Sequence, residues 1–461
     1  MNMRTERDSL GTRSLPASAY YGIQTARAID NFPISGLHLP VEMIRAYALI
    51  KHAAAVANHR VGWLDRRKAH AITRACEELS RGRFDAEFVV DVYQAGAGTS
   101  FNMNVNEVLA NRANELLGGR KGAYRFVHPN DHVNMAQSTN DTFPTAIRLA
   151  CLMKRPALVA SLKDLERALR AKATQFARVV KSGRTHLQDA VPVSLGDEFR
   201  AYALAVAKAR TRIEQAARLL GELNLGGTAT GTGLNAHLRY RTLAVGWLRQ
   251  RTGFSLRPAE HLMERTQSLA DFGHVSGTLR SYSLELIRIA NDLRLMSSGP
   301  STALAEIELP AVQPGSSIMP GKVNPVMAEM IDMVGFQVIG HDATVAIAVQ
   351  AGQLELNVMM PVVAYNLLQA MHIVTTSTQI FARRCVRGIT ADAARCAQLA
   401  SRSFSLVTAL APRIGYLNAA QIAKEALVSG KSIQALVVEQ GLLSRSDAAR
   451  LLNPRRLARI R

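Results

Sequence analysis

Hydrophobic positions recur at helical spacing through most of the chain. The clearest stripe advances in steps of four and three residues and consists of Leu158, Leu162, Leu165, Leu169, Phe176 and Val179, with Lys172 at the one interrupted position. Such an a/d stripe is typical of helices that pack in bundles. Residues 197–223 and 268–298 contain no proline, so each can also form one long helix. These patterns predict a mainly α protein.

The helical pattern changes along the chain and suggests three domains. The first, residues 1–139, opens irregularly up to about residue 40 and continues as mostly helical. Residues 140–394 are expected to form a central bundle of long helices. From residue 395 to 461 the pattern shortens into a small C-terminal helical domain. Long apolar stripes of this kind often bury themselves against other subunits, so we expect an oligomer.

The net charge of +20 raises the question of an anionic partner, because strongly basic proteins bind nucleic acids, anionic membranes or acidic small molecules. The excess of Lys and Arg is spread thinly along the chain, and no basic run is interleaved with aromatic residues of the kind that stack bases. A solvated basic surface is therefore favoured. A nucleic-acid-binding protein built on an enzyme scaffold stays open as an alternative of a different class.

The expected location is the cytoplasm. Cys76, Cys151, Cys385 and Cys396 form no C-x-x-C pair and no metal-ligand spacing with histidine, which fits a reducing compartment. The N-terminus is polar and lacks the apolar segment of a signal peptide. No window approaches 18 uninterrupted apolar residues, so no membrane span is expected.

The segment GSSIMPGKVNP, residues 315–325, carries the strongest chemical signal in the chain. Its glycines permit backbone conformations closed to other residues, and its prolines fix φ and remove donors. We therefore expect a shaped loop, neither helix nor strand. Free backbone N–H groups in such a loop can surround an oxygen anion, and Lys322 adds a positive charge. That chemistry suits a carboxylate substrate whose negative charge grows during the reaction.

Three further polar loops could carry chemistry. In residues 96–104, Thr99 or Ser100 can cap a helix, and a helix N-terminus is also an anion site. The small polar residues of segment 137–144, taken alone, are most typical of a helix cap. In Gly183–Ala190, His186 follows a hydroxyl in a polar turn, and both a structural and a catalytic role are open.

The four loops, in this order and at these spacings, resemble the active-site segments of the fumarase/aspartase superfamily. The match extends over the whole chain, including residues 20–25, 226–235 and 352–359. Thr139 in Ser-Thr-Asn and the Tyr-Tyr-Gly-Ile-Gln-Thr segment are more similar to the aspartase branch than to the fumarases. Departures such as His341 and Met360 leave open a lyase for an aspartate analogue, and a class II fumarate hydratase is the nearer alternative.

The resemblance implies a three-domain fold with a tetrameric helical core and an activity. The implied reaction is reversible anti-elimination of ammonia from L-aspartate, giving fumarate through an aci-carboxylate, without metal or organic cofactor. Ser316 is implied as the base, and His186 as a second catalytic group that assists proton transfer or binds substrate. The implied substrate-binding residues are Thr99, Ser138, Thr139, Asn140, Thr185, Ser317, Lys322 and Asn324. The resemblance also implies a homotetramer whose sites combine loops from three subunits.

Overall fold

The computed structural model describes residues 2–458, and helices account for most of them. The long helices are α5 (Thr139–Gln175), α6 (Leu195–Ala217), α9 (Ala270–Met296), α10 (Val326–Gln350) and α11 (Met360–Arg384). The prediction of a mainly α fold with a long-helix bundle is confirmed. Among the helices of residues 2–458, none combines the length and the apolar character needed to cross a membrane.

Shorter helices lie toward both ends of the chain and, as α7 and α8, between α6 and α9. They are α1 (Ile23–Asn31), α2 (Val41–Arg60), α3 (Arg66–Ser80), α4 (Thr99–Leu116), α7 (Tyr240–Thr252), α8 (Leu262–Gln267), α12 (Ala393–Arg402), α13 (Ala411–Ile414), α14 (Tyr416–Ser429), α15 (Ile433–Glu439), α16 (Arg445–Leu451) and α17 (Pro454–Leu457). The short helices after residue 395 pack around their own apolar cluster, which includes Leu410, Ile422 and Leu436.

The strands form four two-stranded sheets within the described residues. The antiparallel pairs are β1 (Met3–Asp8) with β2 (Gly11–Pro16), β3 (Val180–Thr185) with β4 (Gln188–Ser194), and β7 (Ile307–Glu308) with β8 (Thr390–Ala391); β5 (Glu222–Leu223) and β6 (Arg257–Pro258) are parallel. The expectation of an irregular opening up to about residue 40 was therefore wrong. The first two strands are mostly polar, and each buries only one side chain, Glu6 or Leu15. Their sequences therefore show little of the alternation of apolar and polar residues that predicts a strand.

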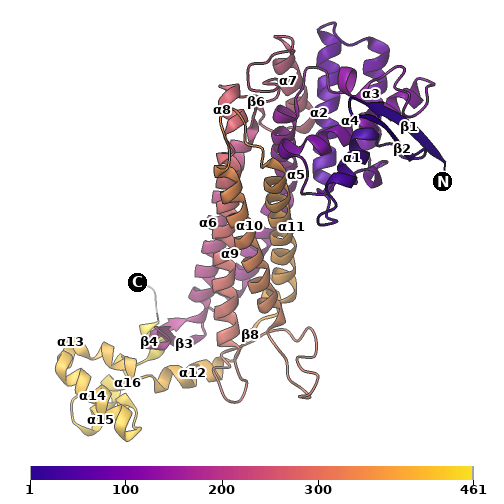
Figure 1. Cartoon of the computed structure of the whole chain (residues 1–461). Helices are drawn as coiled ribbons and strands as arrows, with labels where there is room; N and C mark the ends of the chain where they lie inside the picture. The colour runs from indigo at the N-terminus through magenta and orange to yellow at the C-terminus, as the bar shows by residue number, and fades with distance from the viewer. Residues whose placement is uncertain (1, 459–461) are drawn as a thin grey trace. The chain divides into compact units, whose positions relative to one another are not determined.

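The chain divides into two compact units, and each of the five long helices contributes residues to both. Unit 1 consists of the residues up to 159, 211–281 and 336–374; unit 2 consists of 160–210, 282–335 and the residues from 375 on. Within each unit, segments of the long helices lie side by side (Figure 1). This division differs from the three sequence domains, whose boundaries stay a prediction.

Each unit has an aromatic cluster in its core. In unit 1, Tyr47, Phe101 and Phe143 pack edge to face, with ring centroids 5.6 to 6.4 Å apart. In unit 2, Phe199 packs against Phe176 and Tyr202. The predicted stripe of α5 is buried at its leucines, and the interrupting Lys172 is buried with them. Its Nζ donates to the carbonyl of Ile389 at 2.7 Å, which satisfies the cation inside the apolar stripe.

Candidate active site

A pocket of about 590 Å³ in unit 1 brings together the first two predicted loops. Its walls include Thr99 from the start of α4 and residues 138–140 from the start of α5. Two helix N-termini therefore open into one hollow. Further polar lining comes from Gln24, Asn102, Asn134, Thr228 and Asn235.

The first loop begins α4 in a way that differs from the prediction. Gly98 is the N-cap residue, with φ +84°, and neither Thr99 nor Ser100 caps the helix. The side chain of Gln94 instead accepts the N–H of Phe101 at 2.9 Å. A Cβ at position 98 would lie 2.1 Å from the ring of Phe143, so only glycine fits there. The capping interpretation was wrong because a side chain earlier in the chain takes that role and leaves Thr99 exposed at the pocket.

The second loop is a helix cap, as its composition indicated. Ser138 Oγ accepts the N–H of Asn140 at 3.2 Å, and Asp141 Oδ1 accepts the N–H of Ser138 at 3.0 Å. This reciprocal arrangement is a capping box closed by an aspartate. The Asn140 side chain reaches across to donate to the carbonyl of Ala229 at 2.8 Å. The cap therefore fixes the loop that also lines the pocket.

Asp141 ties this loop to the glycine-rich segment after β5. Its other oxygen, Oδ2, accepts the N–H groups of Gly226 and Thr228, each at 3.0 Å. Thr228 has φ +55°, an unusual conformation for a β-branched residue. Burial raises the pKa of Asp141 to about 7, against the lowering effect of the backbone donors and of Lys51. One buried carboxyl group thus positions two walls of the pocket.

Behind the pocket lies a buried polar network around Lys51, a fully buried residue of α2. Its Nζ donates to Oδ1 of Asn102 at 2.9 Å and to Oδ1 of Asn134 at 3.0 Å. Asn102 in turn donates from Nδ2 to Thr139 Oγ1 at 3.1 Å. Burial lowers the pKa of Lys51 to about 7, and Asp141 opposes this shift. Sequence reasoning missed Lys51 because it lies in a helix far from every polar loop.

The third predicted loop is the tip of the β3–β4 hairpin in unit 2, where only a polar turn was expected. Thr185 pairs with Gln188 across a two-residue turn, His186–Leu187, whose φ angles are +56° and +60°. Positive φ at both turn residues is characteristic of a type I′ turn, whose twist matches that of the flanking strands, although Asn-Gly is the usual sequence. The side chains of Thr185 and His186 are exposed at this tip.

A largely buried ion pair anchors the first strand of the hairpin. Arg184 donates from Nη1 to both oxygens of Glu306 at 3.0 Å, and Lys181 lies 3.4 Å from the same carboxylate. Glu306 is fully buried, whereas Arg184 is partly exposed. Removing Arg184 is costly, because the Glu306 charge stays buried. The pair therefore anchors β3 immediately before Thr185.

The fourth predicted loop, residues 315–325, is irregular, as predicted. Ser316 Oγ accepts two backbone N–H groups, from Ile318 at 3.2 Å and from Met319 at 2.9 Å. The Asn324 side chain closes the loop by donating to the carbonyl of Gly315 at 2.6 Å. A Cβ on Gly315 would lie 2.5 Å from the carbonyl oxygen of Lys322, so this close approach requires glycine. Ser317 and Lys322 are exposed.

The ten predicted site residues thus fall into two groups. Unit 1 gathers Thr99, Ser138, Thr139 and Asn140 in one pocket. Unit 2 carries the hairpin residues Thr185 and His186, and the loop residues Ser316, Ser317, Lys322 and Asn324. A common site for all four loops stays a prediction. Gln24, Asn102 and Asn235 were missed as pocket residues although they belong to segments that carried the resemblance.

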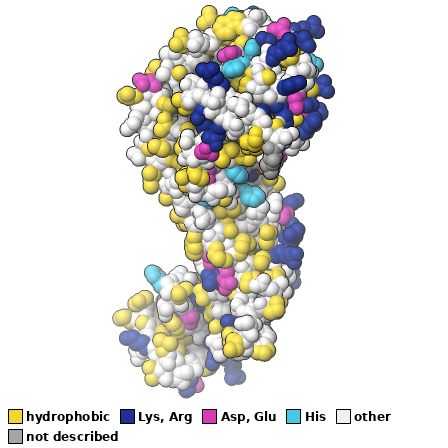
Figure 2. Space-filling model, turned by 45° about the vertical axis from the view of Figure 1, so that its right-hand side comes forward, with side chains coloured by type: hydrophobic (Ala, Val, Ile, Leu, Met, Phe, Trp, Pro, Cys, Tyr) yellow, Lys and Arg dark blue, Asp and Glu magenta, His cyan; other side chains and the backbone are white. Residues whose placement is uncertain are grey.

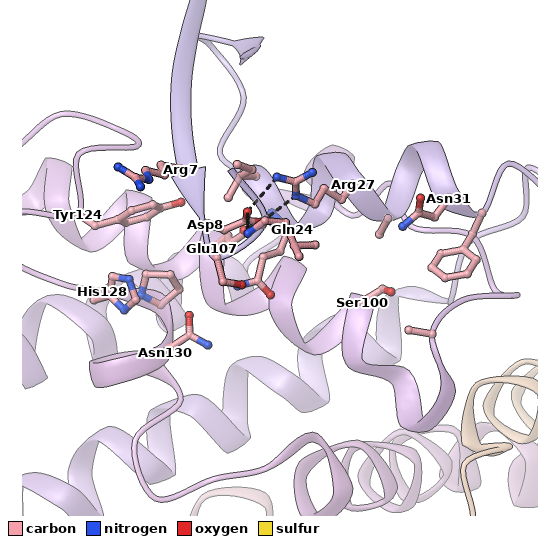
Figure 3. A pocket seen from close by; sticks show the side chains of 17 residues that line it. Arg7, Asp8, Gln24, Arg27, Asn31, Ser100, Glu107, Tyr124, His128 and Asn130 are labelled. Carbon is pink, nitrogen blue, oxygen red and sulfur yellow. Dashed lines mark hydrogen bonds and ion pairs between the residues drawn. The ribbon is translucent and has the colours of Figure 1, made fainter. Parts of the chain in front are cut away.

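A second hollow in unit 1 also has a volume of about 590 Å³ but contains none of the ten predicted residues in its lining. Arg27 donates two hydrogen bonds to the Asp8 carboxylate, at 2.8 and 2.9 Å. His128 and Asn130 lie across the hollow from this pair (Figure 3). The Arg27 guanidinium holds the pKa of the Asp8 carboxyl below its usual range. This ion pair is satisfied within the chain.

Two family models match most of the chain. Residues 11–340 match the model of a family described as lyase, and residues 406–459 match the model described as the C-terminus of fumarase C. The chain belongs to this lyase family, which confirms the resemblance to the fumarase/aspartase superfamily.

Individual proteins are similar to this chain over nearly its whole length. Aspartate ammonia-lyase of Pseudomonas fluorescens is 50% identical over 457 residues, which cover 98% of this chain and 95% of that protein. The crystal structure of fumarate lyase:delta crystallin from Brucella melitensis bound to cobalt has a TM-score of 0.96, 48% identity and full coverage of both chains. Class II fumarase from Schistosoma mansoni also reaches a TM-score of 0.96, at 38% identity and 99% coverage of each chain.

Proposed function

We propose that this protein catalyses the reversible anti-elimination of ammonia from L-aspartate to give fumarate. The observation that carries the proposal is the environment of Ser316, whose Oγ accepts two backbone N–H groups. A serine hydroxyl is a poor base unless its alkoxide is stabilised, and paired backbone donors supply that stabilisation. The 50% identity to an aspartate ammonia-lyase over nearly the whole chain supports the choice of substrate.

The difficult step is removal of a weakly acidic proton from the carbon next to a carboxylate. In the proposed mechanism the Ser316 alkoxide takes that proton, and the electron pair moves into the carboxylate, forming a dianionic aci-carboxylate. Lys322, Asn324 and Ser317 stabilise this group more strongly than the singly charged ground state, which lowers the barrier. The electron pair held by the aci-carboxylate then forms the C=C bond of fumarate as the C–N bond breaks, and the electron pair of the C–N bond leaves with ammonia.

The remaining predicted residues hold the rest of the substrate. Thr185 and His186 at the tip of the hairpin bind the other carboxylate. Thr99, Ser138, Thr139 and Asn140 surround the amino group, and their common pocket in unit 1 supports this assignment. These steps use side chains and backbone groups of the protein and no metal or organic cofactor.

We further propose a homotetramer whose active sites combine loops from three subunits. Helix α10 supports an assembly, because Met333, Phe336 and Ile347 are 63%, 60% and 67% exposed and lie on one face of the helix. Exposed apolar rows of this kind mark protein–protein interfaces. We also propose a cytoplasmic location, which suits the four buried free cysteines.

One assay separates the proposed function from its alternatives. Purified protein is incubated with fumarate, with and without ammonium, and the loss of fumarate absorbance is followed while the products are identified. Aspartate formed only with ammonium supports the proposal. Malate formed without ammonium identifies a fumarase, the alternative favoured by the Schistosoma mansoni structure. No reaction with fumarate in either case would favour a lyase that acts on an aspartate analogue.

A further inference from the structure

Gln24 stands on a fixed part of the backbone at the start of α1. Its N–H group donates to Oε1 of Glu107 at 2.8 Å, and the N–H groups of Gly22 and Thr25 donate to Oε2 of the same carboxylate at 2.9 and 3.1 Å. Glu107 is buried in α4. One carboxylate therefore satisfies N–H groups that the start of a helix leaves free, and it fixes Gln24 against the helix whose first residue lines the candidate active-site pocket.

The side chain of Gln24 lies in the wall of this pocket. Gln24 is half-buried, and both it and Asn130 also line the second hollow (Figure 3). Within residues 2–458 the amide group of Gln24 has no hydrogen-bond partner. The amides of Asn102 and Asn134, in contrast, are bound to Lys51 behind the pocket. Gln24 therefore presents to the pocket an amide that the protein itself does not use.

The amino group of aspartate, an ammonium at neutral pH, depends on acceptors close to it. It has hydrogens to donate and no lone pair. The net charge of +20 makes Lys and Arg side chains prominent on the surface (Figure 2), so the protein as a whole does not attract a cation. Oxygen atoms in the pocket must therefore hold this group.

The hydroxyl groups expected around the ammonium are partly occupied. Ser138 Oγ already accepts the N–H of Asn140, and Thr139 Oγ1 already accepts from Asn102, so each of these oxygens retains one lone pair. An amide oxygen has two lone pairs and no hydrogen of its own. Oε1 of Gln24 therefore adds the type of acceptor that an ammonium needs.

We propose that Gln24 is a further substrate-binding residue whose Oε1 accepts a hydrogen bond from the amino group of aspartate. This inference rests on the proposed function and deepens it. The nitrogen keeps three hydrogens throughout, first in the ammonium of aspartate and then in the ammonia that leaves. The N–H group can therefore donate to Gln24 both before and after the C–N bond breaks. An interaction made equally in the ground state and in the transition state lowers KM without raising kcat.

The kinetic test compares Gln24→Met with the wild type in both directions of the reaction. Methionine has a side chain of similar length and a similar helix propensity but lacks the amide oxygen. We expect KM for aspartate and KM for ammonium to rise about tenfold, with kcat within about twofold and KM for fumarate unchanged. Gln250→Met, at an exposed glutamine of α7 that does not line the pocket, is the control and should change none of these constants.

A binding test does not depend on turnover. Succinate, a dicarboxylate without nitrogen, is titrated calorimetrically into the wild type and into Gln24→Met, and the two should bind it with the same Kd. An unchanged KM for ammonium in the variant overturns the inference. An equal weakening of succinate and ammonium also overturns it, because Gln24 would then not act on the nitrogen. If the wild type forms no aspartate from fumarate and ammonium, the proposed function fails and this inference with it; if only the variant behaves like the wild type, the role of Gln24 alone fails.

Discussion

In unit 1 the polar residues expected to meet the substrate stand on a buried hydrogen-bonded network, whereas in unit 2 they stand at exposed tips. Thr139 is backed by Asn102 and Lys51, and the loop before it is held by Asp141. His186 and Lys322 are exposed. The pocket in unit 1 is preorganised by one chain alone. In unit 2, Ser316 and Asn324 are held by bonds within their own loop, whereas His186 and Lys322 extend outward from exposed positions. Substitutions in the two regions should therefore change different properties: activity alone at the exposed polar residues of unit 2, and stability together with activity in the buried network of unit 1.

The largest effect is expected in unit 2, from Ser316→Ala. The alanine leaves the two N–H donors of Ile318 and Met319 in place but removes the oxygen that takes the proton. We expect kcat to fall by about 10³ to 10⁴-fold, the upper range for loss of a general base. Fumarate formation from aspartate measures it. Near-normal turnover would exclude Ser316 as the base, and Ser301→Ala, at an exposed serine elsewhere in unit 2, is the control.

Lys322→Ala should follow, with a loss of about 10² to 10³-fold in kcat. The side-chain ammonium of Lys322 is exposed on the loop, and its positive charge stabilises the substrate carboxylate that becomes doubly negative. Because it binds substrate as well as transition state, KM should rise while kcat falls. Steady-state kinetics on Lys322→Ala and on Lys208→Ala, an exposed lysine of α6, separate this effect from a general change in charge. An unchanged kcat and KM would remove Lys322 from the site.

The same contrast explains how far the sequence could predict the site. Residue types at fixed spacing named Ser316, Lys322 and Thr99, because hydroxyls, glycines and a lysine in short loops are visible without any structure. Lys51 and the second role of Asp141 could not be read from the sequence, since each depends on contacts with segments distant in the chain: Lys51 with Asn102, and Asp141 with Gly226. Such contacts depend on tertiary packing, which periodicity does not report.

The fold was predicted where periodicity is strong and missed where it is weak. The leucine stripe of α5 indicated a bundle helix, and its residues are buried. The β3–β4 hairpin was missed because its strands carry Pro192 and Gly183 and lack alternation, and because its turn uses His186–Leu187 in place of a recognisable turn sequence.

In unit 1, Asp141→Asn should lower the free energy of unfolding and the activity together. The carboxylate accepts three backbone N–H groups, and an amide in its place turns a donor toward one of them. An unpaired buried N–H costs about 2 kcal/mol. Chemical denaturation measures the stability, and kcat should also fall because both walls of the pocket shift.

The matched control for Asp141→Asn is Asp91→Asn. Asp91 is also buried and accepts the N–H groups of Ser35, Gly36 and Tyr93, but it does not line the pocket. We expect a similar loss of stability, about 2 kcal/mol, with kcat unchanged. Equal losses of kcat in both variants would show that Asp141 affects activity only through global stability.

The smallest effect is expected at the hairpin tip of unit 2, where Leu187→Gly should stabilise the protein. Leu187 holds φ at +60° and is 70% exposed, so it has an unfavourable backbone conformation without the compensation of burial. Glycine adopts positive φ freely, although it also gains conformational entropy in the unfolded chain. The balance should raise the free energy of unfolding by about 0.5 kcal/mol. Gln188→Gly, one residue into β4, meets no such strain and should destabilise the protein by a similar amount. If Leu187→Gly is instead the more destabilising of the two, the side chain of Leu187 makes a contact beyond its own chain, and the tips of unit 2 are completed by a neighbouring subunit.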